Sequence, residues 1–129
     1  MLEKELYPPV KKYLQKEGYE CYEEVKFLTR SIDLVGLKRK KIIAIELKVS
    51  NWLKALQQAL TCRLCAQETY MAISAQFLHR VDIELLQEFG IGLIVVEEKK
   101  IEFILKAKKS KIIHKSMKNK ILLQINGGE

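Results

Sequence analysis

A chain of 129 residues, 48% hydrophobic and 30% charged, has the composition of one soluble globular domain. Its formal net charge is +7, no apolar run approaches the roughly 20 residues of a membrane-spanning helix, and its amino terminus, MLEKELYPPV, lacks the apolar core of a secretory signal. These features argue against a membrane or exported protein, so we expect a cytoplasmic one.

The first expected element is a helix over residues 3–17, in which apolar side chains recur every four residues. Prolines are tolerated in the first turn of a helix, so Pro8 and Pro9 indicate that its regular part begins near residues 5–8. Gly18 should end it. Three strands are then expected, at 21–28, 31–37 and 41–49.

The alternating charges of the first of these strands are typical of a sheet edge, and Lys38-Arg39-Lys40 between the other two is suited to a hairpin. Asn51 is a possible N-cap for a helix that reaches residue 67, with Trp52 beginning its packed face. The remaining expected elements are a strand at 69–74, a helix at 77–89 ending at Gly90, strands at 91–96 and 101–105 that turn through 97–100, and a helix at 110–125 stopping at Asn126-Gly127-Gly128.

This order of elements predicts an α/β protein with a central mixed sheet, because hairpins give antiparallel pairs and helical connections give parallel ones. Helices should cover both faces of the sheet. We expect residues 1–107 to form the domain proper and residues 108–129 a lysine-rich C-terminal extension of the same domain.

The strand sequence KIIAIELKV, at 41–49, sets a carboxylate and an ammonium into an apolar segment. Charge removed from water is costly unless it is paired, hydrogen-bonded or bound to a metal. Glu46 and Lys48 should share one side of the strand, and Asp33 could face Glu46 from the neighbouring hairpin strand. Two carboxylates so placed repel one another unless a cation lies between them, and Mg²⁺ suits a site of this kind.

A second interpretation remains open at this point. Glu46 with Lys48, or Asp33 with Lys48, could form an internal ion pair near the end of a sheet, with no reaction at all.

The spacing of these residues also resembles a known family. The pattern resembles the D-x(n)-(D/E)-x-K signature of the PD-(D/E)XK phosphodiesterase superfamily, with Asp33 followed after 12 residues by Glu46-Leu47-Lys48. That superfamily includes restriction endonucleases and archaeal Holliday-junction resolvases. The core order of that restriction-endonuclease-like fold, αβββαβ, is similar to the order expected over residues 3–74. Ile32 stands where the signature often has proline.

Small bacterial members of the superfamily provide a narrower resemblance that extends over nearly the whole chain. It rests on the segments Glu5-Leu6-Tyr7-Pro8-Pro9-Val10, Ile45-Glu46-Leu47-Lys48, Ala55-Leu56-Gln57-Gln58-Ala59 and Asn126-Gly127-Gly128.

The resemblance implies a site that binds Mg²⁺ (or Mn²⁺) through Asp33, Glu46 and the backbone carbonyl of Leu47. Lys48 would assist the attack of water on a phosphodiester.

The superfamily often supplies a further acid from its first helix and a glutamine from the helix after the E-x-K strand. Glu5 matches the first position better than Glu3, although it could also be a favourable charge at a helix N-terminus. Gln58 is the closer match to the second position, with Gln57 as a rival and a solvent-facing glutamine as the alternative.

The charge excess predicts where nucleic acid would be bound. Between Phe103 and Gly128 there are seven lysines and no acid, which leaves 16 basic and 16 acidic residues elsewhere. Such a run attracts phosphate polymers, although basic ends also serve solubility. Arg63, about three turns beyond Trp52, should lie on the apolar helix face and need an acidic or phosphate partner, or extend outward to solvent. The expected nucleic-acid-binding residues are Arg63, Lys106, Lys108, Lys109, Lys111 and Lys115.

The three cysteines do not indicate a disulfide framework, because their number is odd and no export is expected. Cys62-x-x-Cys65 could be half of a zinc site, but a second close pair of ligands is missing. Some members of the superfamily hold an iron–sulfur cluster with four cysteines. We expect the thiols here to be small buried side chains.

The main hypothesis is therefore a Mg²⁺-dependent nuclease that acts on nucleic acid, with DNA as the expected substrate and a homodimer as one way to cut two strands. The alternatives are a non-catalytic nucleic-acid-binding or regulatory module on the same fold, and a module for protein interaction only.

Overall fold

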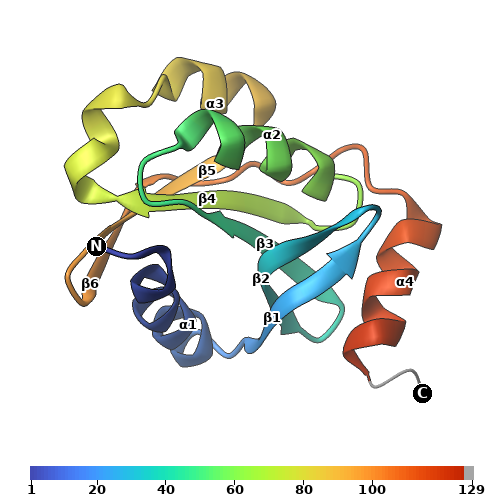
Figure 1. Cartoon of the computed structure of the whole chain (residues 1–129). Helices are drawn as coiled ribbons and strands as arrows, with labels where there is room; N and C mark the ends of the chain where they lie inside the picture. Colours follow the sequence, from blue (N-terminus) through green and yellow to red (C-terminus); the bar gives the residue numbers. More distant parts are fainter. Residues whose placement is uncertain (127–129) are drawn as a thin grey trace.

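The computed structural model describes residues 1–126 and contains one six-stranded mixed sheet flanked by helices (Figure 1). The strands are β1 (Glu20–Phe27), β2 (Arg30–Lys38), β3 (Lys41–Leu47), β4 (Glu68–Ser74), β5 (Gly92–Glu97) and β6 (Lys100–Leu105). The helices are α1 (Tyr7–Lys16), preceded by a 3-10 turn at Glu3–Leu6, then α2 (Trp52–Cys62), a 3-10 helix at Ala75–Arg80, α3 (Ile83–Phe89) and α4 (Lys115–Ile125). The expected α/β class with a mixed sheet is confirmed.

The strands lie side by side in the order of the sequence. β1, β2 and β3 are antiparallel neighbours, as are β5 and β6, whereas β3, β4 and β5 are parallel. The parallel steps are those in which a helical connection returns the chain to the same end of the sheet. β1 is an edge strand, as its alternating charges predict.

The two faces of β3 are covered by different helices. Ile43, Ile45 and Leu47 pack in one cluster with the apolar side of α1. Ile42 and Ala44 point to the other face and pack in a cluster that includes residues from α2 and α4. Figure 1 shows α1 on one side of the sheet and α2 and α3 on the other. Glu46 follows the alternation of Ile42 and Ala44 and lies on the α2 side.

α2 is shorter than the periodicity of the sequence predicts. It begins as expected, since the Asn51 side chain accepts a hydrogen bond from the Lys54 backbone N–H at 3.1 Å. It ends at Cys62 instead of residue 67, because the next residues turn back toward the sheet. There the backbone N–H of Gln67 donates to the carbonyl of Ile42 at 2.9 Å, an interaction with the sheet that a continuing helix would not allow.

The single helix expected over residues 77–89 is two shorter pieces. A 3-10 helix ends at Arg80, and Asp82 then caps α3 by accepting a hydrogen bond from the backbone N–H of Leu85 at 3.1 Å. Gly90 ends α3 as expected, with a φ of 73° that favours glycine.

The last expected helix begins later than residue 110. α4 starts at Lys115, where the His114 ring accepts a hydrogen bond from the Met117 backbone N–H at 3.4 Å. The chain from 106 to 114 is irregular and held to the domain by contacts such as the one from the Ser110 hydroxyl to the carbonyl of Arg63, at 2.7 Å. Ile121 is buried in the cluster on the α2 face. The expected stop at Gly127-Gly128 lies outside the described residues.

None of the helices in residues 1–126 is long and apolar enough to span a membrane.

Candidate active site

The structure brings Asp33 and Glu46 together where β2 and β3 part. The antiparallel pairing of these strands ends at Leu34 and Ile45, so Asp33 and Glu46 occupy the next opposed positions. The carboxylate of Asp33 accepts a hydrogen bond from the Leu47 backbone N–H at 2.8 Å. This bond fixes the Asp33 side chain against the end of β3, beside Glu46.

Glu46 is fully buried and has neighbours of both signs. Its Oε2 lies 2.8 Å from a guanidinium nitrogen of Arg30 and 3.4 Å from the thiol of Cys62. Its Oε1 is buried without a hydrogen-bond partner among the described residues. Burial, and then the charge of Asp33, raise the pKa of Glu46 to about 7, while Arg30 acts in the opposite direction. The carboxylate thus has one satisfied oxygen and one oxygen free to bind a further group.

Arg30 is a site residue that sequence reasoning missed. It is the first residue of β2, and its guanidinium is held by the backbone carbonyls of Ser31 and Gln58 and by the Thr61 hydroxyl. An arginine placed three residues before Asp33, at the start of a buried strand, was the available signal. Because Arg30 is bound on several sides, it holds Oε2 of Glu46 in a fixed place.

Lys48 follows directly after β3 and is partly buried. Its ammonium lies 3.6 Å from Oε1 of Glu3. In residues 1–126 no ion pair joins Lys48 to Asp33 or Glu46, so the alternative of an internal pair between them does not describe this structure. The Lys48 ammonium is therefore paired with a third acid at the end of β3 that carries Glu46.

That third acid is Glu3 and not Glu5, which is a correction. Glu5 is exposed, and its carboxylate accepts a hydrogen bond from the Leu2 backbone N–H at 3.1 Å, which is the role of a charge at a helix N-terminus. Glu3 belongs to the 3-10 turn before α1, and its carboxylate reaches Lys48.

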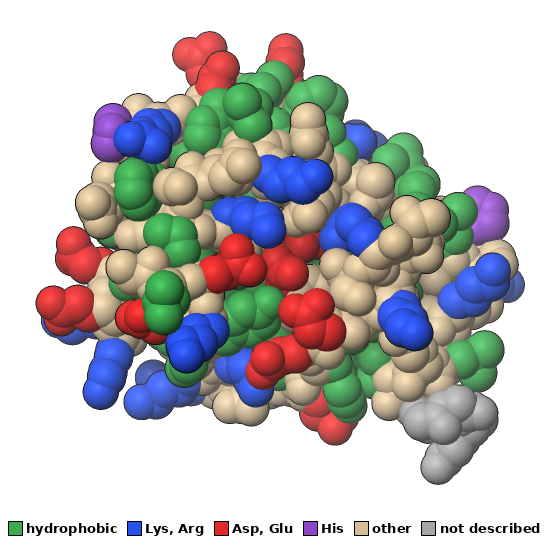
Figure 2. Space-filling view, in the orientation of Figure 1, with side chains coloured by type: hydrophobic (Ala, Val, Ile, Leu, Met, Phe, Trp, Pro, Cys, Tyr) green, Lys and Arg blue, Asp and Glu red, His purple; other side chains and the backbone are tan. Residues whose placement is uncertain are grey.

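Tyr7 borders the same place, and sequence reasoning also missed it. Its hydroxyl donates to Glu24 at 3.2 Å, and its pKa is raised well above the ordinary value by burial and then by the charges of Asp33, Glu24 and Glu3. Glu3, Tyr7 and Glu24 line an open hollow of about 650 Å³. Figure 2 shows acidic side chains gathered near the middle of this face, with basic side chains bordering them.

Gln58 contacts the site residue Arg30 through its backbone carbonyl and not through its side chain. Its carbonyl accepts hydrogen bonds from Arg30 and from the Thr61 hydroxyl, the latter at 2.9 Å. Gln57 is exposed, so of the two glutamines the structure places Gln58 nearer to the carboxylate pair.

Arg63 is not brought to the site, which corrects the expectation of an apolar helix face. Because α2 ends at Cys62, Arg63 caps it, donates from Nε to the Leu60 carbonyl at 3.0 Å, and stacks 5.5 Å above the Phe89 ring. Within the described chain, no ion pair or hydrogen bond joins Asp33, Glu46 or the Lys48 ammonium to any of the basic residues Arg63, Lys106, Lys108, Lys109, Lys111 and Lys115.

These basic residues gather elsewhere. Arg63, Lys108, Lys109 and Lys111 line one hollow of about 280 Å³ beside α3, Lys106 lines a cavity under α1, and Lys115 opens α4.

The two cysteines of the C-x-x-C sequence are buried free thiols, as expected. Burial raises the pKa of Cys65 to about 12 and that of Cys62 well above its ordinary value. Thiols with raised pKa values are poor zinc ligands. Cys62 instead contacts Glu46.

In residues 1–126 no group of three or more His, Cys, Asp or Glu side chains is arranged to hold a metal. The carboxylates of Asp33 and Glu46, with the Leu47 carbonyl, nevertheless fit Mg²⁺, which uses one or two carboxylates and keeps several waters. The unpartnered Oε1 of Glu46 and the repulsion between the two acids are the observations in favour of a cation there.

Comparison with known proteins adds a likeness of fold. No family model and no curated protein matches the sequence. Among solved structures, a protein of unknown function from Silicibacter pomeroyi superposes with a TM-score of 0.77 at 17% identity, over 99% of this chain and 86% of that one. At this identity the likeness concerns the fold alone.

Proposed function

We propose that this protein is a Mg²⁺-dependent nuclease of the PD-(D/E)XK type, which hydrolyses phosphodiesters of nucleic acid, with DNA as the expected substrate, in the cytoplasm. The observation that carries the proposal is the pair formed by Asp33 and Glu46. One acid is fixed by a backbone N–H, and the other is buried with an oxygen that has no partner.

In this proposal the free oxygens of Asp33 and Glu46 and the Leu47 carbonyl hold Mg²⁺ or Mn²⁺. The bound ion would polarise a phosphate oxygen and lower the pKa of a coordinated water. Arg30 keeps Oε2 of Glu46 occupied and so leaves Oε1 for the ion. Lys48 stands at the same strand end, where its ammonium can orient the attacking water or neutralise charge that develops on the phosphate.

Glu3 and Tyr7 form the border of the proposed site on the α1 side. Glu3 holds the Lys48 ammonium at 3.6 Å, a distance that leaves it able to turn toward a phosphate. Glu3 and Tyr7 both line the open hollow between α1 and β1, so in this proposal a nucleic-acid strand would approach from that side.

Cleavage assays with matched variants test the proposal. Wild type should cut at least one of single-stranded, duplex or branched DNA in Mg²⁺, and EDTA should stop the reaction. Asp33→Asn and Lys48→Ala should each lower the rate at least about 100-fold, because each removes a group that acts on the reacting atoms.

Lys99→Ala, which changes an exposed lysine in the β5–β6 turn, should cut like wild type. Circular dichroism should show the same fold for all proteins. Cleavage that survives Asp33→Asn, or a wild type that cuts none of the three substrates, contradicts the proposal.

One observation favours the alternative of a binding or regulatory module without turnover. Arg30 already neutralises Glu46 at 2.8 Å, as a resident cation would. In that case wild type should bind nucleic acid in a salt-dependent manner, bind no Mg²⁺, and be unaffected by Asp33→Asn.

A further inference from the structure

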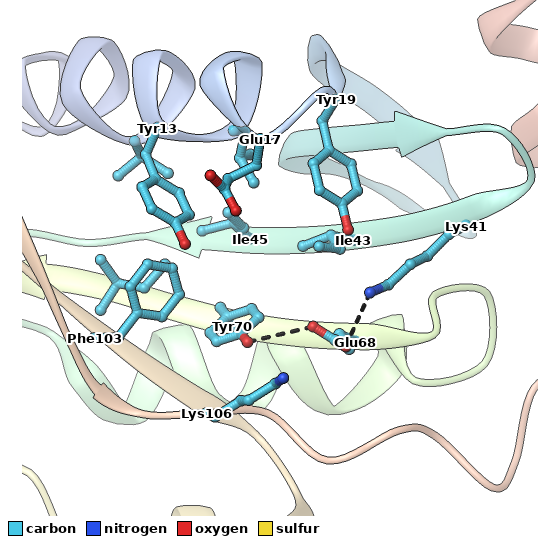
Figure 3. A pocket seen from close by; sticks show the side chains of 13 residues that line it. Tyr13, Glu17, Tyr19, Lys41, Ile43, Ile45, Glu68, Tyr70, Phe103 and Lys106 are labelled. Atoms are coloured by element: carbon cyan, nitrogen blue, oxygen red, sulfur yellow. Dashed lines mark hydrogen bonds and ion pairs between the residues drawn. The ribbon is translucent and has the colours of Figure 1, made fainter.

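A cavity of about 200 Å³ lies on the opposite face of the sheet from Glu46, between α1 and the strands (Figure 3). Its floor is apolar and comes from Ile43 and Ile45 of β3 and Ile94 of β5. A cavity of this volume has room for a small planar ring.

Aromatic rings form the walls of this cavity. The Tyr13 and Phe103 rings are 4.9 Å apart between centroids, and Phe103 meets Tyr70 edge to face at 5.4 Å. Tyr19 stands on the far side, and Figure 3 shows the hydroxyl groups of Tyr13 and Tyr19 pointing from the α1 side toward the sheet. Phe103, which lines the cavity, is 37% exposed to solvent. Such walls bind a flat ring by stacking.

The polar groups of the cavity are arranged around Glu68. Its carboxylate lies 3.1 Å from the Lys41 ammonium and accepts a hydrogen bond from the Tyr70 hydroxyl at 3.3 Å (Figure 3). Glu17 and Lys106 also line the cavity and, within residues 1–126, take part in no ion pair. The cavity therefore offers both donors and acceptors to the edge of a ring.

A basic hollow of about 390 Å³ adjoins the cavity and shares Lys41 and Glu68 with it. Lys40, Lys109 and Lys118 complete its charged lining, so four ammonium groups face one carboxylate there. This surplus of positive charge is placed for a phosphate.

Tyr19 lines the aromatic cavity and has two lysines beside its ring. The ammonium groups of Lys38 and Lys41 lie 5.6 and 6.0 Å from its ring centre, so cation–π contacts hold the ring in place.

We propose that this aromatic cavity and the adjoining basic hollow bind one unpaired nucleotide, with its base between the Tyr13–Phe103 ring pair and Tyr19 and its phosphate against Lys40, Lys41 and Lys109. This inference rests on the proposed function in that it names the substrate class, a nucleic acid with a single-stranded segment. Stacking on aromatic side chains beside cationic groups is how proteins bind single strands. A base in a duplex is stacked and paired, and cannot enter.

The bound nucleotide would be one that anchors the strand and not the one that is cut. Ile43 precedes Glu46 by about 10 Å along the strand and points to the other face. Loss of this contact should therefore weaken binding without touching the carboxylate pair.

The test measures binding in EDTA in an Asp33→Asn background, so that it does not depend on cleavage. Fluorescence anisotropy compares a short labelled single strand with the same strand annealed to its complement. The single strand should bind more tightly. Tyr19→Leu and Phe103→Leu should each weaken its binding roughly fivefold or more, whereas Tyr13→Phe, which keeps the ring, should not.

Tyr22→Leu is the matched control, since Tyr22 is a half-buried tyrosine of β1 that packs on the other face. Thermal unfolding of each variant shows that it is folded. Equal binding of single strand and duplex, or unchanged binding in both leucine variants, overturns the inference even if wild type is an active nuclease.

Competition distinguishes a strand from a free nucleotide. Displacement by deoxyadenosine monophosphate, but not by inorganic phosphate at the same concentration, supports the site and shows that a free nucleotide suffices to fill it. Equal displacement by inorganic phosphate contradicts a base-binding cavity.

Discussion

At the scale of single residues, Glu46 is the side chain whose state decides what the site can do. It is fully buried between a cation, Arg30, and a second acid, Asp33. Burial and the neighbouring acid favour its neutral form, and Arg30 favours the charged one. Because its pKa is raised to about 7, the protonation of Glu46 changes near neutral pH.

This raised pKa predicts how stability depends on pH in the absence of metal. Between the ordinary value of 4.5 and about 7 the folded protein holds a proton on Glu46 that the unfolded chain has lost. Stability from this group therefore falls as pH rises through that range. Compared with Glu46→Gln, which cannot titrate, wild type should lose about 2–3 kcal/mol in its free energy of unfolding between pH 5 and 8.

Urea denaturation of both proteins in EDTA measures this difference, since other titrating groups cancel. At pH 8, Mg²⁺ should restore stability to wild type and leave Glu46→Gln unchanged. A difference between the two proteins that stays constant from pH 5 to 8 would mean that the carboxylate is charged throughout.

Some of the site residues, but not all, can be predicted from their spacing in the sequence. Asp33 and Glu46 meet because a two-residue hairpin turn fixes the register of β2 on β3, which the sequence reveals. Arg30 was missed, and Glu3 was ranked below Glu5, because the contacts of Arg30 and Glu3 depend on a three-dimensional approach between segments far apart in the chain. Glu3 and Glu5 lie in the same 3-10 turn before α1, and their contacts distinguish them, since Glu3 meets Lys48 and Glu5 meets the Leu2 backbone.

At the scale of elements, the sequence patterns located the strands and most of the helices but not their ends, and they merged the 3-10 helix at Ala75–Arg80 with α3. Asn51 and Gly90 carry local signals, a side-chain cap and a positive φ, and both boundaries were predicted from the sequence. The end of α2 depends on a hydrogen bond from Gln67 to Ile42 of β3, and the start of α3 on a new cap at Asp82. Such tertiary contacts override the local pattern.

The packing of β4 on β5 gives an element-scale prediction. A Cβ added at Gly92 would lie 2.7 Å from the Ala107 backbone nitrogen and would also overlap the buried ring of Tyr70. Gly92→Ala should therefore destabilise the protein by about 1–3 kcal/mol, because backbone and a buried ring must shift. Urea denaturation measures the change.

Gly36→Ala is the matched control in β2. Its Cβ would come no closer than 3.3 Å to the partly buried side chain of Tyr19, so its cost should be smaller. Equal losses in the two variants would show that the tight contact at Gly92 does not decide the packing there.

At the scale of the whole molecule, the carboxylate pair and the lysines of the C-terminal segment lie in different places. The carboxylate pair lies at the Glu46 end of β3 on the α2 face, with Lys48 beside it. The lysines of the C-terminal segment lie near the start of β3, beside the β2–β3 turn, and near the end of α3. The excess charge was visible in the sequence, but its place was not, because the irregular chain from 106 to 114 follows no periodic pattern.

The proposed cleavage site and the proposed nucleic-acid-binding surfaces therefore lie in different parts of the molecule, which the sequence did not predict. In the proposed account the carboxylate pair cuts a phosphodiester, and the basic and aromatic surfaces hold the rest of the nucleic acid. The expectation of a homodimer stays a prediction that follows from two-strand cleavage alone.

The most direct measurement of the central claim is the anomalous scattering of Mn²⁺ in crystals of the wild-type protein grown at or above neutral pH. The account predicts one peak between the carboxylates of Asp33 and Glu46, within coordination distance of both and of the Leu47 carbonyl, and no such peak in Asp33→Asn. A map at saturating Mn²⁺ that shows no density between the two acids, with Glu46 still held by Arg30 alone, would contradict it.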